Sequence, residues 1–326
     1  MLKNISLKFI CLVSLVMLIL LIGCSTESEI LIDEEYDILT YEYLSVEKEN
    51  SDFSDINYSF INKEIYQNGT INYYYVTNPN SNAEMYVSVY VPNETDGKTI
   101  ILIPGGIGSS DDFIDPGMVD DFMGEGFITI IFDADGRGLS SGEEDYNGYV
   151  QQDGLYGIYR FVENYDGVNK ENIGLASFSY GVSMASGMLG RYQDSVNIKY
   201  YIEWEGPTNR FYVTVGCKET SHINAIKEGV DCNDEEYWLE REALRFVPYF
   251  KVDYFQIIQG QKDHVQSTYM HSVDANNLAV KYLDWVKVND GDINQLYNNK
   301  NVPVIENYLV YLNEYALNYA IELSEK

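Results

Sequence analysis

At residues 172–181 the chain reads Asn172-Ile173-Gly174-Leu175-Ala176-Ser177-Phe178-Ser179-Tyr180-Gly181. An apolar strand pattern runs into a tight turn with Ser179 at its apex, and a run of small residues typical of a closely packed helix follows. This is the context of a nucleophile elbow, in which a strained strand-to-helix turn lifts a serine hydroxyl out of a sheet. We therefore predict a buried strand, a turn and a helix here, with Ser179 as the candidate nucleophile.

The match to the pattern Gly-x-Ser-x-Gly is incomplete, because Ser177 stands where the first glycine is expected. Small residues are needed on both sides of the nucleophile, since the turn brings the strand and helix backbones close together. Serine is small enough to meet that need. The pentapeptide alone leaves open an ordinary strand-to-helix turn rich in serine and glycine.

Short apolar runs elsewhere predict strands that are buried on both faces of a parallel sheet. Two runs rich in strand-forming residues flank the turn residues 78–82, and the second run alternates apolar with polar or aromatic residues. This predicts an antiparallel hairpin over 72–91, ahead of the buried runs. Helical periodicity falls between most of the runs, so we expect a doubly wound α/β domain with helices on both faces. The predicted buried strands are 99–103, 128–132, 173–176, 198–202, 254–258 and 285–288.

Two helices are predicted from apolar residues that recur at helical spacing. The first contains Leu155, Ile158, Tyr159 and Val162, and the second contains Ile305, Leu309, Leu312 and Ala316 behind Pro303.

The alternation of strand and helix lapses between Pro207 and Lys251. We interpret about 208–250 as an insertion that forms a lid over the carboxyl edge of the sheet. It contains Cys217 and Cys232, which either form a disulfide or remain two buried thiols. The domain itself is expected to span 61–326, preceded by an acidic tether at 24–60.

The N-terminal residues 1–23 have the pattern of a signal peptide, with Lys3 and Lys8 ahead of an apolar run. That run ends in Leu21-Ile22-Gly23-Cys24, which resembles a prokaryotic lipobox and implies cleavage before Cys24 and lipidation of its thiol. A plain secretory signal with a chance cysteine is the alternative. The first interpretation predicts an extracytoplasmic protein held at a membrane by acyl chains alone.

The chain is strongly acidic, with a formal net charge of −30 that becomes −32 once Lys3 and Lys8 are removed with the signal peptide. No basic patch is expected to hold a phosphate backbone, so nucleic-acid binding is excluded from our expectations. Only three histidines are present, and no Cys/His spacing resembles a zinc site. We expect no metal and no organic cofactor.

The antiparallel start, the parallel strands and the serine turn together resemble the α/β-hydrolase fold over about residues 70–326. In that fold, the loop after the first parallel strand and the residue after the nucleophile donate backbone N–H groups to an oxyanion hole. The corresponding loop here is Ile103-Pro104-Gly105-Gly106-Ile107-Gly108. The resemblance therefore implies oxyanion donors at Gly106 or Ile107 and at Tyr180.

A second stretch, Phe132-Asp133-Ala134-Asp135-Gly136-Arg137-Gly138-Leu139-Ser140-Ser141-Gly142, is similar to the D-x-R-G-x-G-x-S-x-G motif of the prolyl-oligopeptidase, Xaa-Pro dipeptidyl-peptidase and esterase branches. Its role there is mainly structural. Taken alone, it would be a polar surface loop.

The third stretch is an apolar strand followed by Gly260-Gln261-Lys262-Asp263, and the resemblance makes Asp263 the triad acid. In this fold the base is a histidine after the last strand, but residues 285–295 contain none, and Asp292 stands near the expected position. A carboxylate there is a poor base toward a serine hydroxyl. His222, His264 and His271 remain as alternatives, although the side chains of the neighbours His264 and Asp263 are expected to diverge.

Two functions follow from this pattern. The leading hypothesis is an exported, lipid-anchored serine hydrolase that cleaves an ester or peptide-like acyl bond in a small-molecule or peptide substrate. The other is a catalytically impaired hydrolase fold that serves as a surface binding lipoprotein, because the expected histidine is missing.

Overall fold

The computed structural model describes residues 56–212, 230–306 and 312–326. The chain divides into two units, Met1–Glu42 and Tyr43–Lys326, and every described residue belongs to the second. The predicted signal peptide, the predicted lipidation site Cys24 and most of the predicted tether lie outside the described residues, as do Cys217 and His222. In the described ranges, no helix is both long enough and apolar enough to cross a membrane.

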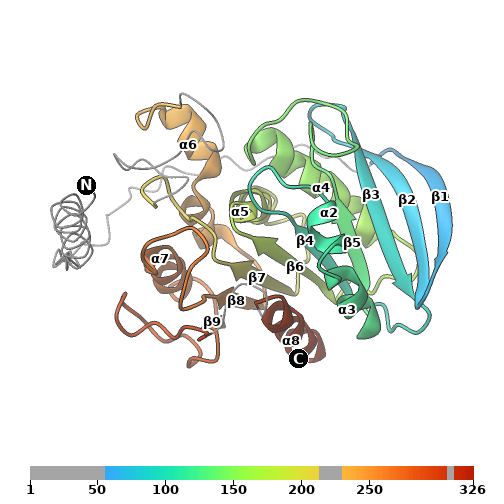
Figure 1. The fold of residues 1–326 in the computed structure, drawn as a ribbon. Helices are drawn as coiled ribbons and strands as arrows, with labels where there is room; N and C mark the ends of the chain where they lie inside the picture. The colour runs from blue at the N-terminus through green and yellow to red at the C-terminus, as the bar shows by residue number, and fades with distance from the viewer. Residues whose placement is uncertain (1–55, 213–229, 307–311) are drawn as a thin grey trace, which may run out of the picture. The chain divides into compact units, whose positions relative to one another are not determined.

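A nine-stranded mixed sheet forms the centre of the described unit, in the order β1-β2-β3-β5-β4-β6-β7-β8-β9 (Figure 1). The pairs β1–β2, β2–β3 and β3–β5 are antiparallel, and all other neighbours are parallel. This confirms the predicted α/β class with an antiparallel hairpin ahead of a parallel sheet. The strands are β1 (Tyr58–Tyr66), β2 (Gly69–Thr77), β3 (Glu84–Pro92), β4 (Thr99–Ile103), β5 (Ile128–Phe132), β6 (Ile173–Phe178), β7 (Tyr200–Trp204), β8 (Tyr254–Ile258) and β9 (Val286–Val288).

Helices cover both faces of the sheet, which explains the continuous apolar runs of its central strands (Figure 1). The helices are α2 (Asp111–Ile114), α3 (Met118–Gly124), α4 (Tyr149–Glu163), α5 (Gly181–Arg191), α6 (Glu235–Arg241), α7 (Met270–Ala279) and α8 (Leu312–Glu325), with short 3₁₀ turns at Ala243–Arg245 and Val247–Tyr249. In β4, Ile101 and Ile103 face the core under α4, α5 and α7, whereas Ile100 and Leu102 face the core under α3 and α8.

The edge strand β1 begins at Tyr58, inside the segment that we interpreted as the end of the tether. Eight of its nine residues are exposed, so the apolar pattern that marks a buried strand is missing. Its partner β2 supplies the pairing, from Tyr58 opposite Val76 to Tyr66 opposite Gly69.

The second predicted helix is wrong at its start. Ile305 forms a parallel bridge with Gly260, in which its N–H donates to the Gln259 carbonyl at 2.9 Å and its carbonyl accepts from Gln261 at 2.8 Å. The helical spacing that includes Ile305 therefore does not reflect a helix at this residue. The described part of α8 begins at Leu312.

The described part of the predicted lid packs on α5. Ser183 of α5 donates its hydroxyl to the Arg241 carbonyl at 2.7 Å, and Phe246 lies fully buried against Gly190. Cys232 is disulfide-bonded, and its predicted partner Cys217 falls in the range 213–229, outside the described residues. The part of the insertion that includes Arg241 and Phe246 is thus packed into the core against α5.

Candidate active site

Ser179 lies at the sharp turn between β6 and α5, as the sequence predicts. Its backbone has a φ of 50°, in the left-handed region that a non-glycine residue adopts at a cost of about 1–2 kcal/mol. Its N–H donates to the carbonyl of Trp204 on the neighbouring strand at 2.8 Å, which holds the turn against the sheet. Strain held by surrounding structure is typical of a functional position.

Two glycines make room for this turn. A Cβ at Gly181 would lie 2.6 Å from the Pro104 carbonyl oxygen, and one at Gly105 would lie 2.9 Å from the Ser179 Cβ. Neither position can accept a larger residue without moving the backbone.

The structure accounts for a serine at position 177, where the pattern Gly-x-Ser-x-Gly has its first glycine. Its side chain is buried within β6, and its hydroxyl shares a 2.7 Å hydrogen bond with the hydroxyl of Tyr201 on β7. A serine is therefore accommodated in the buried strand, because Tyr201 on the adjacent strand supplies a polar partner for its hydroxyl.

His264 supplies the imidazole that the linear pattern failed to place. Its Nε2 lies 2.8 Å from the Ser179 Oγ, and its ring stacks on Trp204 with centroids 4.9 Å apart and planes inclined by 13°. The loop after β8, which is the last strand but one, therefore carries the histidine. His264 was one of the three histidines that the sequence left open, and the structure brings its imidazole to Ser179.

Glu205 holds the other side of this imidazole. Its Oε2 lies 2.8 Å from the His264 Nδ1 and also accepts the His264 backbone N–H at 3.3 Å, while its Oε1 accepts from Gly260 N at 2.7 Å. The carboxylate is an acceptor only, so Nδ1 carries the proton and Nε2 is free to accept the Ser179 hydroxyl proton. Glu205 is fully buried at the end of β7. Glu205 was not among the site residues predicted from the sequence.

Asp263, which we predicted as the triad acid, is held elsewhere. Its nearest oxygen lies 3.5 Å from the His264 Nδ1, and its carboxylate instead accepts the backbone N–H groups of Val265 and Gln266 at 2.8 and 2.7 Å. Its other oxygen lies 3.1 Å from Nε2 of the buried His271. We expected the two side chains to diverge, but their nearest polar atoms lie 3.5 Å apart, and Glu205 is the closer carboxylate to the His264 Nδ1 at 2.8 Å.

The charge on Asp263 is stabilised by these partners. Burial alone would raise its pKa, but the hydrogen bond and charge of His271, together with the Val265 and Gln266 N–H groups, bring the pKa below its usual value. His271 in turn faces the Gly206 carbonyl through Nδ1 at 3.0 Å. His271 is therefore a partner of Asp263, and its two ring nitrogens face Asp263 and the Gly206 carbonyl, not Ser179.

A third acidic residue, Glu203, lies two positions before Glu205 on β7. It is completely buried, and burial raises its pKa to about 8, with the charges of Glu205 and Asp263 adding to the shift against the N–H of Gly206. Glu203 is therefore mainly protonated at neutral pH.

The loop after β4 lies beside the serine. Gly106 has a φ of 55°, and a Cβ there would meet no atom within 4 Å, so this side of the loop is open. Within the described part of the chain, neither Ile107 nor Tyr180 has a hydrogen-bond acceptor for its backbone N–H. Both groups are thus available as donors, as an oxyanion hole requires.

The motif at 132–142 connects this loop to the sheet. The Asp133 carboxylate accepts from Ser110 N at 2.8 Å and from Leu139 N at 2.7 Å, and Arg137 forms a two-pronged ion pair with Glu144. The side chains of Asp133 and Arg137 are buried. These contacts give the motif the structural role that the resemblance implies.

Glu205, Asp263 and His264 also offer ligand atoms within 4.8 Å of one another, which is compatible with a metal ion. Both ring nitrogens of His264 already have hydrogen-bond partners, however. A metal ion on Nδ1 would replace the proton in its hydrogen bond to Glu205. The donor set is accounted for by hydrogen bonds.

Comparisons with known proteins place this arrangement in a structural context. No family profile matches the sequence, and no curated protein sequence is significantly similar to it. Among solved structures, acetyl xylan esterase 1 from Thermoanaerobacterium sp. is 14% identical with a TM-score of 0.58, over 82% of this chain and 88% of that chain. An S-formylglutathione hydrolase from Agrobacterium tumefaciens is 12% identical with a TM-score of 0.57, over 82% and 99%.

Est1E from Butyrivibrio proteoclasticus, solved with ferulic acid bound, is 19% identical with a TM-score of 0.54, over 75% of this chain and 97% of that chain. A fungal protein described as an α/β hydrolase, GrgF from Penicillium sp., has the same TM-score at 12% identity. Strand order, the serine turn and these likenesses together show that the chain has the α/β-hydrolase fold.

Proposed function

We propose that this protein is a serine hydrolase that cleaves esters through Ser179, His264 and Glu205. The observation that carries the proposal is the continuous hydrogen-bond chain from the serine hydroxyl through the imidazole to a buried carboxylate, with both links at 2.8 Å. This is the geometry in which an imidazole can take the proton of an attacking hydroxyl.

The chemistry follows the roles of such a triad. His264 Nε2 accepts the proton as Ser179 Oγ attacks the acyl carbon, and Glu205 stabilises the imidazolium that forms. The N–H groups of Ile107 and Tyr180 hold the oxyanion, and His264 then protonates the departing alcohol. Water, activated by the same imidazole, then attacks the acyl-enzyme and releases the carboxylic acid product.

Ester cleavage is favoured over amide cleavage because the named structural neighbours include acetyl xylan esterase 1 and Est1E. The impaired binding protein that we considered loses its motivation, because it rested on a missing histidine. Asp263 is proposed to support the site through its contacts with the His264 turn, with Glu205 as the acid.

We also propose that the enzyme acts outside the cytoplasm, anchored through lipid on Cys24. The support is the apolar run that ends in Leu21-Ile22-Gly23-Cys24. Incorporation of labelled palmitate into the full chain, lost in Cys24→Ala, would test this part independently of catalysis.

The test of catalysis is hydrolysis of p-nitrophenyl acetate by residues 25–326, with Ser179→Ala as the control. We expect turnover in the parent protein and its loss in the variant. Equal turnover in both proteins would rule out Ser179 as the nucleophile.

A further inference from the structure

Asn147 joins the two loops that carry the proposed oxyanion donors. Its side-chain Nδ2 donates to the Gly106 carbonyl at 3.3 Å and to the Tyr180 carbonyl at 3.1 Å. The residue is fully buried and comes from neither loop, but from the turn that precedes α4. A single amide group therefore fixes both loops relative to each other.

The orientation of this amide is determined by its neighbours. Oδ1 faces the guanidinium of Arg137 at 3.0 Å, which can only donate, whereas Nδ2 faces two carbonyl oxygens, which can only accept. Exchanging the two atoms would place like groups against each other at all three contacts. Arg137 is itself fixed by its two-pronged pair with Glu144, so the amide is held from behind.

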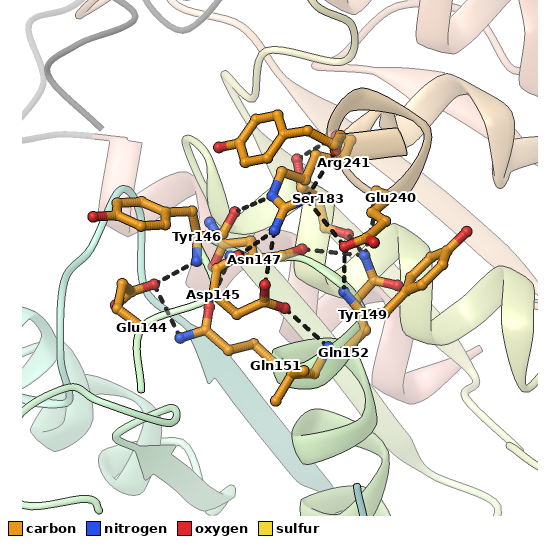
Figure 2. Close-up of polar contacts among 12 residues, drawn as sticks. Glu144, Asp145, Tyr146, Asn147, Tyr149, Gln151, Gln152, Ser183, Glu240 and Arg241 are labelled. Carbon is orange, nitrogen blue, oxygen red and sulfur yellow. Dashed lines mark hydrogen bonds and ion pairs between the residues drawn. The ribbon is translucent and has the colours of Figure 1, made fainter. Parts of the chain in front are cut away.

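The backbone of Asn147 is held just as completely. Its N–H donates to the Gln151 Oε1 at 2.7 Å, and its carbonyl accepts from the Gln152 Nε2 at 3.1 Å. Figure 2 shows Asn147 within this network, together with Arg241, which binds the preceding residues Asp145 and Tyr146. With a φ of 65°, the residue keeps a strained backbone that these contacts stabilise.

The contact with Gly106 acts on the oxyanion donor through one peptide group. The Gly106–Ile107 peptide is trans, so its carbonyl and its N–H point in opposite directions. Holding the carbonyl toward Asn147 aims the Ile107 N–H away from it, and the flexible glycine at 106 cannot reverse the peptide while the contact persists. The second contact fixes the Tyr180 carbonyl at the start of α5, next to the other donor.

We propose that Asn147 is a positioning residue for the oxyanion hole, which keeps the Ile107 and Tyr180 N–H groups at a fixed separation. The inference rests on the proposed function, since it assigns a role within the same site. It also gives the motif at 132–142 a role in the site. Arg137 of this motif binds the side-chain amide of Asn147, and that amide binds the loop at Gly106.

The test uses two variants of residues 25–326. Asn147→Gly removes the side chain and tolerates the positive φ, and Asn147→Asp keeps the shape while replacing the donor with an acceptor. For p-nitrophenyl acetate we expect kcat to fall by about 10- to 1,000-fold with KM changed by less than about threefold, because the contact matters most as negative charge develops. Affinity for a trifluoromethyl ketone should fall by a similar factor.

The matched control is Asn82→Gly, the same substitution at an exposed residue with a φ of 61°. It should leave kcat and the ketone affinity unchanged. An unchanged kcat in folded Asn147→Gly and Asn147→Asp, or a loss confined to KM, would overturn the inference.

A second readout separates this inference from the proposed function. Amide hydrogen exchange in the segment 104–110 should quicken in both Asn147 variants and stay unchanged in Asn82→Gly, whether or not the protein turns over an ester. If the parent protein shows no turnover that depends on Ser179, the proposed function fails. Unchanged exchange in the Asn147 variants would overturn the positioning role in either case.

Discussion

The Nδ1 of His264 lies 2.8 Å from the Oε2 of Glu205, a residue fifty-nine positions earlier in the chain. The carboxylate of Asp263, the residue before His264, lies 3.5 Å from the same nitrogen and accepts the backbone N–H of Val265 instead. Glu205 and His264 thus follow β7 and β8, and Ser179 follows β6, so three adjacent parallel strands bring the proposed triad together at one edge of the sheet.

The assignment of the acid predicts unequal effects of two conservative substitutions. Glu205→Gln should lower kcat/KM by about 10³- to 10⁴-fold, because the amide can no longer stabilise the imidazolium or fix its tautomer. Asp263→Asn should cost less than about tenfold. Steady-state kinetics with p-nitrophenyl acetate compares them, and the reverse order of effects would return the acid role to Asp263.

The serine turn should not tolerate a methyl group at its second glycine. A Cβ at Gly181 would stand 2.6 Å from the Pro104 carbonyl oxygen, so we predict that Gly181→Ala costs about 1–3 kcal/mol of stability and most of the activity. Gly124→Ala is the control, because a Cβ there meets no atom within 4 Å at the end of α3. Urea unfolding would show the difference, and equal stability of the two variants would contradict the prediction.

Restoring the consensus glycine should weaken the fold without harming catalysis. Ser177→Gly removes the hydrogen bond to Tyr201 and adds backbone freedom within β6, so we expect a loss of about 1–2 kcal/mol in the free energy of unfolding. The value of kcat should change less than about threefold, since the Ser177 hydroxyl bonds to Tyr201 and not to Ser179 or His264. A large fall in kcat at unchanged stability would show that Ser177 acts on the site itself.

Burial of Glu203 predicts a pH dependence of stability. Because its pKa rises from 4.5 in the unfolded chain to about 8 in the folded one, the folded state retains a proton that the unfolded state loses in between. The unfolded state then binds fewer protons, so this residue's contribution to stability falls as pH rises from about 4.5 to about 8.

Glu203→Gln should remove this trend, with a gain over the parent that grows across that interval to an order of 1–4 kcal/mol. Chemical denaturation at several pH values measures it. Parallel pH profiles in parent and variant would mean that the Glu203 carboxyl titrates normally.

Much of this arrangement could be predicted from local sequence. The buried runs marked the parallel strands because helices cover both faces of the sheet, and the serine turn was recognisable because its steric demands fall on adjacent residues. The exposed strand β1 left no such apolar pattern, and Ile305 mimicked helical spacing while forming a bridge to Gly260.

The proposed triad was harder to predict, because its three residues are far apart in the sequence and come together only at the ends of neighbouring strands. Glu205 lies one residue beyond an ordinary buried strand, and nothing in the sequence around Trp204 separates it from Glu203. His264 could be chosen over the other histidines only once the direction of the turn after β8 was known, because the sequence does not say which of Asp263 and His264 faces Ser179.

The most direct measurement of the central claim is labelling of residues 25–326 with a fluorophosphonate probe, in the parent, Ser179→Ala, His264→Ala and His222→Ala proteins. We predict labelling of the parent and of His222→Ala, and none of Ser179→Ala or His264→Ala, because the 2.8 Å contact of the imidazole activates the hydroxyl. Full labelling of His264→Ala, or none of the folded parent, would contradict a nucleophile activated by His264.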